Sequence, residues 1–226
     1  MKKKEYQELE YKITGDENFI RKLFPVPYEL DVQLENLYLL ALKGKKSGIK
    51  KLTGFILKYP KVPALKNYLS VLYNNLNLPD KSYEVNHWTV AEHPDYLFGK
   101  LNLAAEYFFK EEYDRMPEVL GESMELKQLY PQRDTFHISE VVGFFKISIL
   151  YFSAIGDLEQ AEIRLDILKE IAPDSAELET ARQHYDLALL KDNFIRREEE
   201  REKEINVKPQ KIVLTNIETP SFKEDI

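Results

Sequence analysis

The four histidines are among the residues of this chain best able to do chemistry, and His87 follows a glutamate at ligand spacing. Glu84 and His87 are three positions apart, which on a helix places both side chains on one face, where they can hold a metal ion. A di-iron bundle needs a second such pair and two further glutamates on facing helices. The sequence contains no second Glu-x-x-His. We therefore expect no metal and no cofactor, and we interpret His87 as a packed or surface side chain.

A second candidate is the tripeptide His93-Pro94-Asp95. It resembles the tripeptide by which J-domain co-chaperones stimulate their Hsp70 partner. In that family a basic helix comes just before the tripeptide, whereas residues 80–93 of this chain contain a single lysine, Lys81. Pro94 also lies thirty-four residues after Pro60, where a helical repeat would end. We therefore interpret the tripeptide as structural.

Motifs of the common enzyme classes are missing from the sequence. There is no Gly-rich phosphate loop, no Gly-x-Ser-x-Gly, no His-Glu-x-x-His and, without cysteine, no Cys-x-x-Cys. The sequence therefore predicts that the protein is not an enzyme.

Apolar residues at spacings of three and four predict helices that fold back on each other in pairs between residues 29 and 193. We expect about nine helices, with a second helix of the third pair over 113–129 and a last helix from 176 to about 191. Asp174 to Glu177 reads as the capping box of that last helix. The predicted stripes include Leu30, Leu34, Leu37 and Ala41; Ile49, Leu52, Phe55 and Ile56; and Leu65, Leu69, Leu72 and Leu76.

These pairs resemble tetratricopeptide repeats. The resemblance rests on Leu69, Ser70, Tyr73, Ser82 and Pro94; on Leu103, Ala104, Tyr107 and Leu120; and on Phe145, Phe152, Gly156, Asp157, Ala161, Leu165 and Pro173. It implies an all-α fold of antiparallel helix pairs stacked in a right-handed superhelix. Asn86, Met116 and Ser148 depart from the family pattern, and the third and fourth units are longer, at thirty-seven and forty-two residues.

The resemblance also implies a concave groove, along the inner face of each first helix, that binds an extended peptide or a helix. Position within the repeat places Gln33 and Leu37 there, together with the predicted site residues Asn67, Tyr68, Val71, Asn74, Asn75, Leu101, Asn102, Ala105, Phe108 and Phe109. Asparagine amides can pair with both N–H and C=O of a bound backbone, and aromatic rings provide anchoring area. Phe108 and Phe109 have an equally good alternative, which is packing against the fourth unit.

Composition narrows the partners and the compartment. The chain has 226 residues, a net charge of −7 and a pI of about 5.3. This acidic balance argues against nucleic acid and against an anionic membrane surface. We expect no apolar run of transmembrane length, and the basic start, up to Tyr11, has no apolar region of a signal peptide behind it. The sequence therefore predicts a soluble, cytoplasmic protein.

The ends of the chain differ from its middle in composition. We expect residues 1–28 to form an arm that packs on the first repeat, because Gly15, Pro25 and Pro27 interrupt any long element. Residues 194–226 begin with a charged run that can extend the last helix, and we expect them to be a largely disordered tail. Phe222 and Ile226 could anchor this tail as a tethered ligand.

Together these observations predict a non-catalytic scaffold or adaptor, a monomer or weak homo-oligomer, that binds another protein in the groove. The alternative is a structural subunit of a larger assembly, which makes its contacts through the ends of the array or through the tail. An RNA-binding array would need a basic groove, and the predicted groove is neutral.

Overall fold

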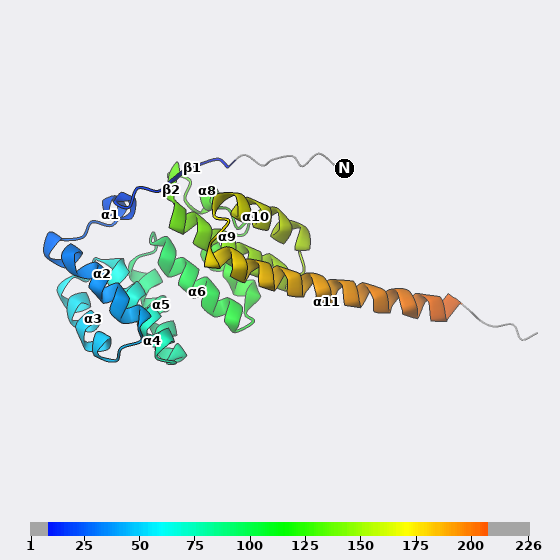
Figure 1. Ribbon diagram of the computed structural model, residues 1–226, viewed down its shortest axis with the longest axis horizontal. Coiled ribbons are helices and arrows are strands. Elements are labelled where there is room, and N and C mark those ends of the chain that lie inside the picture. The colour runs from blue at the N-terminus through cyan, green and yellow to red at the C-terminus, as the bar shows by residue number, and fades with distance from the viewer. Residues whose placement is uncertain (1–8, 208–226) are drawn as a thin grey trace, which may run out of the picture. The chain divides into compact units, whose positions relative to one another are not determined.

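A computed structural model of the protein describes residues 9–207, and helices dominate this part (Figure 1). Within the described residues, 9–189 belong to one compact unit and 190–207 to a second. The elements are β1 (Lys12–Thr14), α1 (Phe19–Leu23), α2 (Tyr28–Leu42), α3 (Ser47–Lys58), α4 (Pro63–Asn75), α5 (Pro79–Glu92), α6 (Leu97–Phe109), the 3-10 turn η1 (Tyr113–Arg115), α7 (Met116–Leu120), α8 (Leu126–Leu129), β2 (Thr135–His137), α9 (Ile138–Ile155), α10 (Leu158–Ile171) and α11 (Ala176–Val207).

Helices that follow one another in the chain pack side by side (Figure 1). α2 packs on α3 and α4, α4 on α5, α5 on α6, and α9 on both α6 and α10. The expectation of a mainly helical chain with packed neighbouring helices is confirmed. Within the described residues there are eleven α-helices instead of about nine, because the arm contributes α1 and the third pair is divided.

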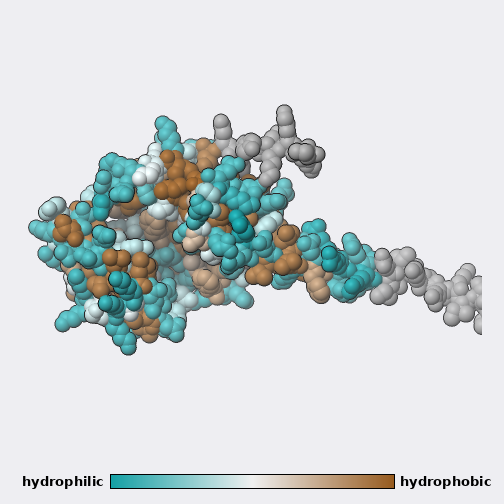
Figure 2. Space-filling view, viewed as in Figure 1, coloured by the Kyte–Doolittle hydropathy of each residue, from teal (hydrophilic) through white to brown (hydrophobic). Residues whose placement is uncertain are grey.

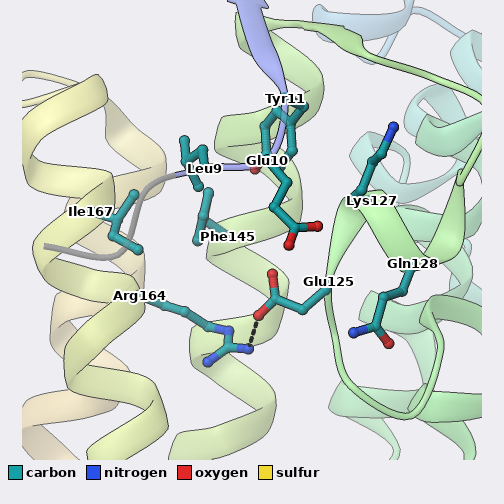
Figure 3. Close-up of a pocket in the computed structure, with 9 residues that line it drawn as sticks. All are labelled: Leu9, Glu10, Tyr11, Glu125, Lys127, Gln128, Phe145, Arg164 and Ile167. Atoms are coloured by element: carbon teal, nitrogen blue, oxygen red, sulfur yellow. Dashed lines mark hydrogen bonds and ion pairs between the residues drawn. The ribbon is translucent and has the colours of Figure 1, made fainter.

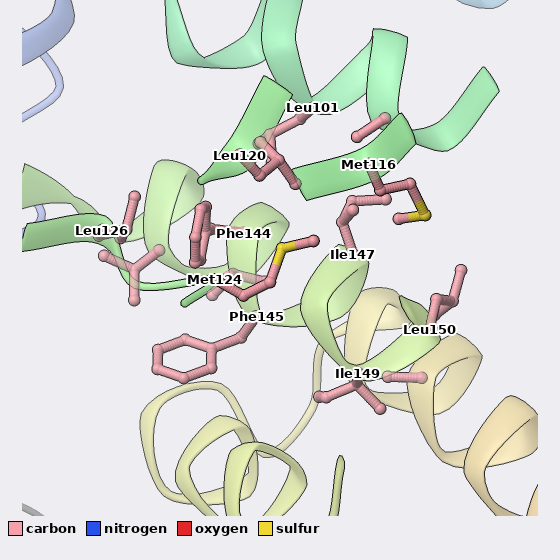
Figure 4. Packing of buried hydrophobic residues seen from close by; sticks show 14 of the residues in the cluster. Leu101, Met116, Leu120, Met124, Leu126, Phe144, Phe145, Ile147, Ile149 and Leu150 are labelled. Atoms are coloured by element: carbon pink, nitrogen blue, oxygen red, sulfur yellow. The ribbon is translucent and has the colours of Figure 1, made fainter. Parts of the chain in front are cut away.

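Two apolar cores hold these helices together. The smaller core joins α2, α3 and α4 and is built on Leu30, Leu37, Leu52, Leu65 and Leu72. The larger core surrounds α9 and reaches α6, α7 and α10 (Figure 4). Figure 4 shows residues of α9, among them Phe144 and Ile147, packed beside Leu120 of α7 and the loop residue Met124. α9 is therefore the central helix of the larger core.

The predicted helix over 113–129 is wrong. The chain forms η1, then α7, which ends at Gly121, and then α8. Gly121 has φ +85° and Met124 has φ +50°, both outside the right-handed helical region. The apolar spacing of this segment concealed the break, since Met116 and Leu120 of α7 and Leu126 of α8 are all buried although they belong to two short helices.

The arm does not pack on the first helix pair alone. β1 pairs in parallel with β2, with Ile13 opposite Phe136, and Tyr11 stacks edge-on against Phe136 at 5.0 Å. Figure 1 shows β1 beside β2, near the start of α9. From there the chain passes through α1 to α2. The arm therefore links the fourth helix pair to the first, which no local sequence pattern indicated.

The helix ends have identifiable caps, although not all of the predicted ones. Pro63 and Pro79 begin α4 and α5, as is common for proline in a first helical turn. Gly156, at φ +82°, ends α9. At α11 the hydroxyl of Ser175, and not Asp174, accepts the cap bond, which comes from the Leu178 amide at 3.1 Å. The N-cap is therefore Ser175, one residue after the predicted one, and with Leu178 at the third helical position it is a single cap bond and not a capping box.

α9 is long and apolar enough to cross a membrane by length and composition alone, contrary to the expectation of no such segment. Most of it is buried inside the fold, and its first turn carries Glu140, whose carboxylate pairs with Arg133 at 2.7 Å. α9 passes the hydropathy test for a membrane span because other helices surround it in the larger core, so that most of its side chains are apolar.

α11 continues to Val207, so the first part of the expected tail is helical. Ion pairs one turn apart, Arg196 with Asp192 and Arg201 with Glu198, support this charged part of the helix. The predicted tail anchors Phe222 and Ile226 lie outside the described residues.

Candidate functional site

A groove of about 700 Å³ lies on the unit that ends at Leu189. Side chains of α2, α4, α6 and α9 line it, and α1 and the first turn of α11 add to its edge. Figure 2 shows this face hollowed between α1–α2 and α9, with apolar side chains in patches among hydrophilic ones. The four helix pairs are α2 with α3, α4 with α5, α6 with the divided segment of α7 and α8, and α9 with α10. In each pair, the first helix lines the groove.

Six of the ten predicted site residues lie along this groove: Asn67, Tyr68, Val71, Leu101, Asn102 and Ala105. They follow the helical period, since residues 64, 67, 68 and 71 of α4 and 101, 102 and 105 of α6 share one face each. Leu37 does not line the groove, because it is fully buried in the smaller core; its neighbours Leu34, Glu35 and Tyr38 line the groove instead.

The other four predicted site residues do not line the groove. Asn75 uses its amide to bond the carbonyl oxygens of Ala41 and Leu42, at 3.0 and 3.3 Å, and so holds the end of α2. Asn74 is exposed beyond the groove. Phe108 is buried against His184 and Tyr113, with ring centroids 5.2 and 5.7 Å apart, and Phe109 is 70% exposed. Of the two alternatives for Phe108, the structure favours packing.

Two asparagines join α4 and α6 at the groove. The amide nitrogen of Asn102 donates to the side-chain oxygen of Asn67 at 2.5 Å. This bond leaves the amide nitrogen of Asn67 and the side-chain oxygen of Asn102 without a partner among the described residues. One donor and one acceptor therefore remain for a bound backbone, which has the same two groups.

Aromatic rings form one wall of the groove. Tyr38 of α2 lies against Tyr68 of α4 at 5.2 Å, and Tyr96 contacts Phe24 at 5.1 Å and Phe98 at 5.6 Å. Burial is the main cause that raises the pKa of the Tyr68 hydroxyl, and it raises the pKa of Tyr96 further. Both tyrosines are therefore neutral at physiological pH. Tyr96 is 4% exposed, so the ring faces and hydroxyl groups that a ligand can reach on this wall are those of Tyr38 and Tyr68.

Part of this groove was not visible in the sequence. Phe24 and Arg21 come from the arm, where the ion pair of Arg21 with Asp31 and the contact of Phe24 with Tyr96 hold them at the groove. Gly143 and Lys146 of α9 also line it. The repeat pattern could have found these two, because α9 is the first helix of the fourth pair and presents its equivalent face.

A smaller cavity of about 260 Å³ lies where the arm meets α8, α9 and α10 (Figure 3). The guanidinium of Arg164 donates to Glu125 at 2.6 Å and to Gln160 at 2.7 Å, and also reaches the Ser123 carbonyl at 3.3 Å. Burial raises the pKa of the Glu125 carboxyl, while Arg164 opposes the shift. Both terminal nitrogens of Arg164 are bonded within the chain, so this arginine holds the loop 121–125 against α10.

The tripeptide residue His93 belongs to a buried lysine cluster. Lys66 of α4 is fully buried, and its ammonium nitrogen lies 2.9 Å from His93 Nε2, 2.9 Å from a Glu92 carboxylate oxygen and 3.0 Å from the Pro60 carbonyl. The Trp88 ring lies 4.7 Å from the same nitrogen. His93 thus accepts a hydrogen bond from Lys66, which is a structural role at the end of α5.

This cluster predicts a pH-dependent stability. Burial, with the Lys66 charge as second cause, lowers the pKa of His93 below its ordinary value. On acidification the unfolded chain therefore takes up this proton first, and stability falls as the pH drops from about 7 through the ordinary histidine pKa of about 6.5. We expect His93→Gln to flatten this part of the pH profile, measured by urea unfolding at several pH values. A profile unchanged by the substitution would contradict the assignment.

The Glu84 and His87 pair does not form a metal site. His87 Nε2 lies 3.3 Å from a carboxylate oxygen of Glu106, which also pairs with Lys110 at 2.9 Å. Throughout residues 9–207, no three His, Cys, Asp or Glu side chains are grouped so that they could hold a metal ion.

No protein-family model, curated protein or solved structure matches this chain. The resemblance to tetratricopeptide repeats therefore stays a prediction, and the function has to be argued from the groove.

Proposed function

We propose that this protein is a non-catalytic, cytoplasmic helical-repeat protein of tetratricopeptide type, and that it binds a segment of another protein in the groove. One observation carries the proposal. The groove is lined by the first helix of all four pairs, which is where a stack of helix pairs has its concave face.

The packing of the helices supports a repeat arrangement. A small buried residue lies in α4, α6 and α10, namely Ser70, Ala104 and Ala161, and lets neighbouring helices approach closely. Asn86, which departs from the family pattern, is explained by its contacts: Ser70 Oγ donates to Asn86 Oδ1 at 2.6 Å, and the Ser82 hydroxyl lies 2.8 Å from Ser70 Oγ. A polar bond between α4 and α5 thus replaces an apolar contact.

The chemistry of the groove supports a peptide ligand. The groove combines the unbonded amide nitrogen of Asn67 and the unbonded side-chain oxygen of Asn102 with the aromatic wall of Tyr38 and Tyr68. Peptide-binding sites commonly combine hydrogen bonds to the peptide main chain with aromatic rings that anchor its side chains.

Binding can be tested with a displayed library of random peptides selected on the wild-type protein. Tyr38 is 41% exposed in the groove, so Tyr38→Ala should remove the ring without unfolding the chain. We expect the selected peptides to lose about tenfold or more in affinity for this variant, because an aromatic anchor is lost.

The matched control is Leu57→Ala on α3, which truncates an 80% exposed side chain outside the groove. It should bind the selected peptides as the wild type does. Peptides that bind both variants equally would place the binding surface elsewhere and contradict the proposal.

A second candidate function is assembly through α11. Beyond Leu189 this helix exposes the large apolar side chains of Leu190, Phe194 and Ile195. Exposed apolar side chains grouped on one helix are typical of a surface that contacts another protein. If the protein is an assembly subunit, Leu190→Ser/Phe194→Ser will change its oligomeric state in sedimentation, whereas Tyr38→Ala will not.

A further inference from the structure

The charges in the groove are not balanced. Arg21 is satisfied by Asp31, with 2.8 Å between the guanidinium and the carboxylate. Three glutamates that line the groove, Glu17, Glu35 and Glu177, have no ion pair among the described residues, and a single lysine, Lys146, is likewise unpaired. The free carboxylates therefore outnumber the free ammonium groups three to one, and the groove offers a negative field to a ligand.

Some tyrosines of the described residues have a cation of the chain over or beside the ring, and others, the groove residues Tyr38 and Tyr68 among them, have none. Tyr59, Tyr73, Tyr83, Tyr107 and Tyr130 each have a lysine or arginine of the chain over or beside the ring, at 4.1 to 6.0 Å from the centroid. Within residues 9–207, neither Tyr38 nor Tyr68 has such a cation. Their ring faces are therefore still available for cation–π contact.

One free carboxylate and the free rings adjoin each other. Glu35 and Tyr38 are three residues apart on α2, so both lie on the face that lines the groove, and Tyr38 touches Tyr68 of α4. A carboxylate beside exposed ring faces is the combination that receives a guanidinium or ammonium group.

The arm shows that such a segment fits. α1 contributes Ile20 and Arg21 to the edge of the groove, and Phe24 follows directly after it. A cation flanked by apolar side chains therefore already lies there, paired with Asp31. A bound segment with a cation and apolar side chains would lie beside this part of the arm, and its cation could contact Glu35 and the rings of Tyr38 and Tyr68.

We infer that the ligand of the groove is a basic, partly apolar protein segment, which places a lysine or arginine between Glu35 and the rings of Tyr38 and Tyr68. This inference rests on the proposed function and adds the class of partner to it. The net charge of −7 over the chain assists the encounter with a basic segment at low salt.

The test uses three synthetic fluorescein-labelled peptides with the same leucine and phenylalanine residues and with arginine, serine or glutamate at the positions between them. Fluorescence anisotropy with the full chain should give the tightest binding for the arginine peptide and a decline as salt is raised. Glu35→Lys should weaken the arginine peptide about five- to tenfold, because an attraction becomes a repulsion. Tyr38→Leu should weaken it about threefold through loss of the cation–π contact.

The matched control is Glu84→Lys, an exposed glutamate in the middle of α5 that does not line the groove. It makes the same change in net charge and should leave the affinity for the arginine peptide within about twofold, since long-range screening is strong. An equal loss in Glu84→Lys would show attraction to the whole acidic chain and would overturn the inference.

Two further outcomes are decisive. A serine or glutamate peptide that binds as tightly as the arginine peptide, and that competes with library-selected peptides, would overturn the basic partner while leaving the groove as the binding site. Failure of all three peptides would also overturn it. The proposed function itself fails only if the library yields no peptide that depends on Tyr38, so the two failures are distinguishable.

Discussion

Arg133→Ala is expected to destabilise the fold by about 3–5 kcal/mol, because it leaves a buried carboxylate without its partner. Glu140 is 1% exposed, and both of its oxygens are bonded by the Arg133 guanidinium, at 2.7 and 3.1 Å. The same guanidinium lies 4.2 Å from the Phe136 ring. After the substitution, the Glu140 carboxylate keeps only the hydrogen bond that it accepts from the His137 backbone amide, at 3.0 Å. Urea unfolding at constant m-value measures the loss.

Two further variants distinguish the loss of the buried ion pair from the mere shortening of an arginine side chain. Arg201→Ala removes an exposed arginine whose pair with Glu198 lies on the surface of α11, and it should change stability by less than about 1 kcal/mol. Arg133→Met/Glu140→Leu removes both charges and should recover much of the loss. If Arg133→Ala costs no more than Arg201→Ala, the junction of β2 and α9 does not depend on this pair.

Phe144→Ala should cost about 3–5 kcal/mol, as large-to-small changes in well-packed cores do. The ring is 2% exposed and lies in the larger core on α9 (Figure 4). The neighbouring backbone belongs to a long helix, so the space cannot close by a local shift, and a cavity remains. The shift in urea midpoint gives the measurement.

Phe109→Ala is the matched control for this prediction, since it is the same substitution at a ring that is 70% exposed. We expect a cost below about 1 kcal/mol, from the edge contact with Phe108 at 5.5 Å. A large loss in Phe109→Ala, together with a small one in Phe144→Ala, would show that the larger core is placed wrongly.

The helices that the sequence predicted best have a clear apolar period and a proline at the start. α4 is an example: Leu65, Leu69 and Leu72 are buried at the predicted spacing, and Pro63 begins the helix. Local information suffices there, because one face is buried and the turn chemistry marks the end. Six groove residues were found by the same reasoning, from the opposite face of α4 and α6.

The arm and the third pair show where local information ends. Three residues of β1 pair with three residues of β2 more than a hundred positions away. Leu9, Tyr11 and Ile13 alternate with polar residues as in a strand, but so short a run does not identify a partner so distant in the sequence. In the third pair, Pro117 and Gly121 divide a segment whose apolar spacing reads as one helix. Asn75 was placed in the groove although its amide has a structural task, which only the fold of α2 against α4 reveals.

The most direct test of the central claim is to map, by amide chemical shifts, where a library-selected peptide binds to the wild-type chain. Binding in the groove predicts the largest changes at Ala64, Ala105 and Gly143, small residues on α4, α6 and α9 that line it. Shifts confined to exposed positions of α3, α10 or the part of α11 beyond Leu189, with these three amides unmoved, would contradict a ligand-binding groove.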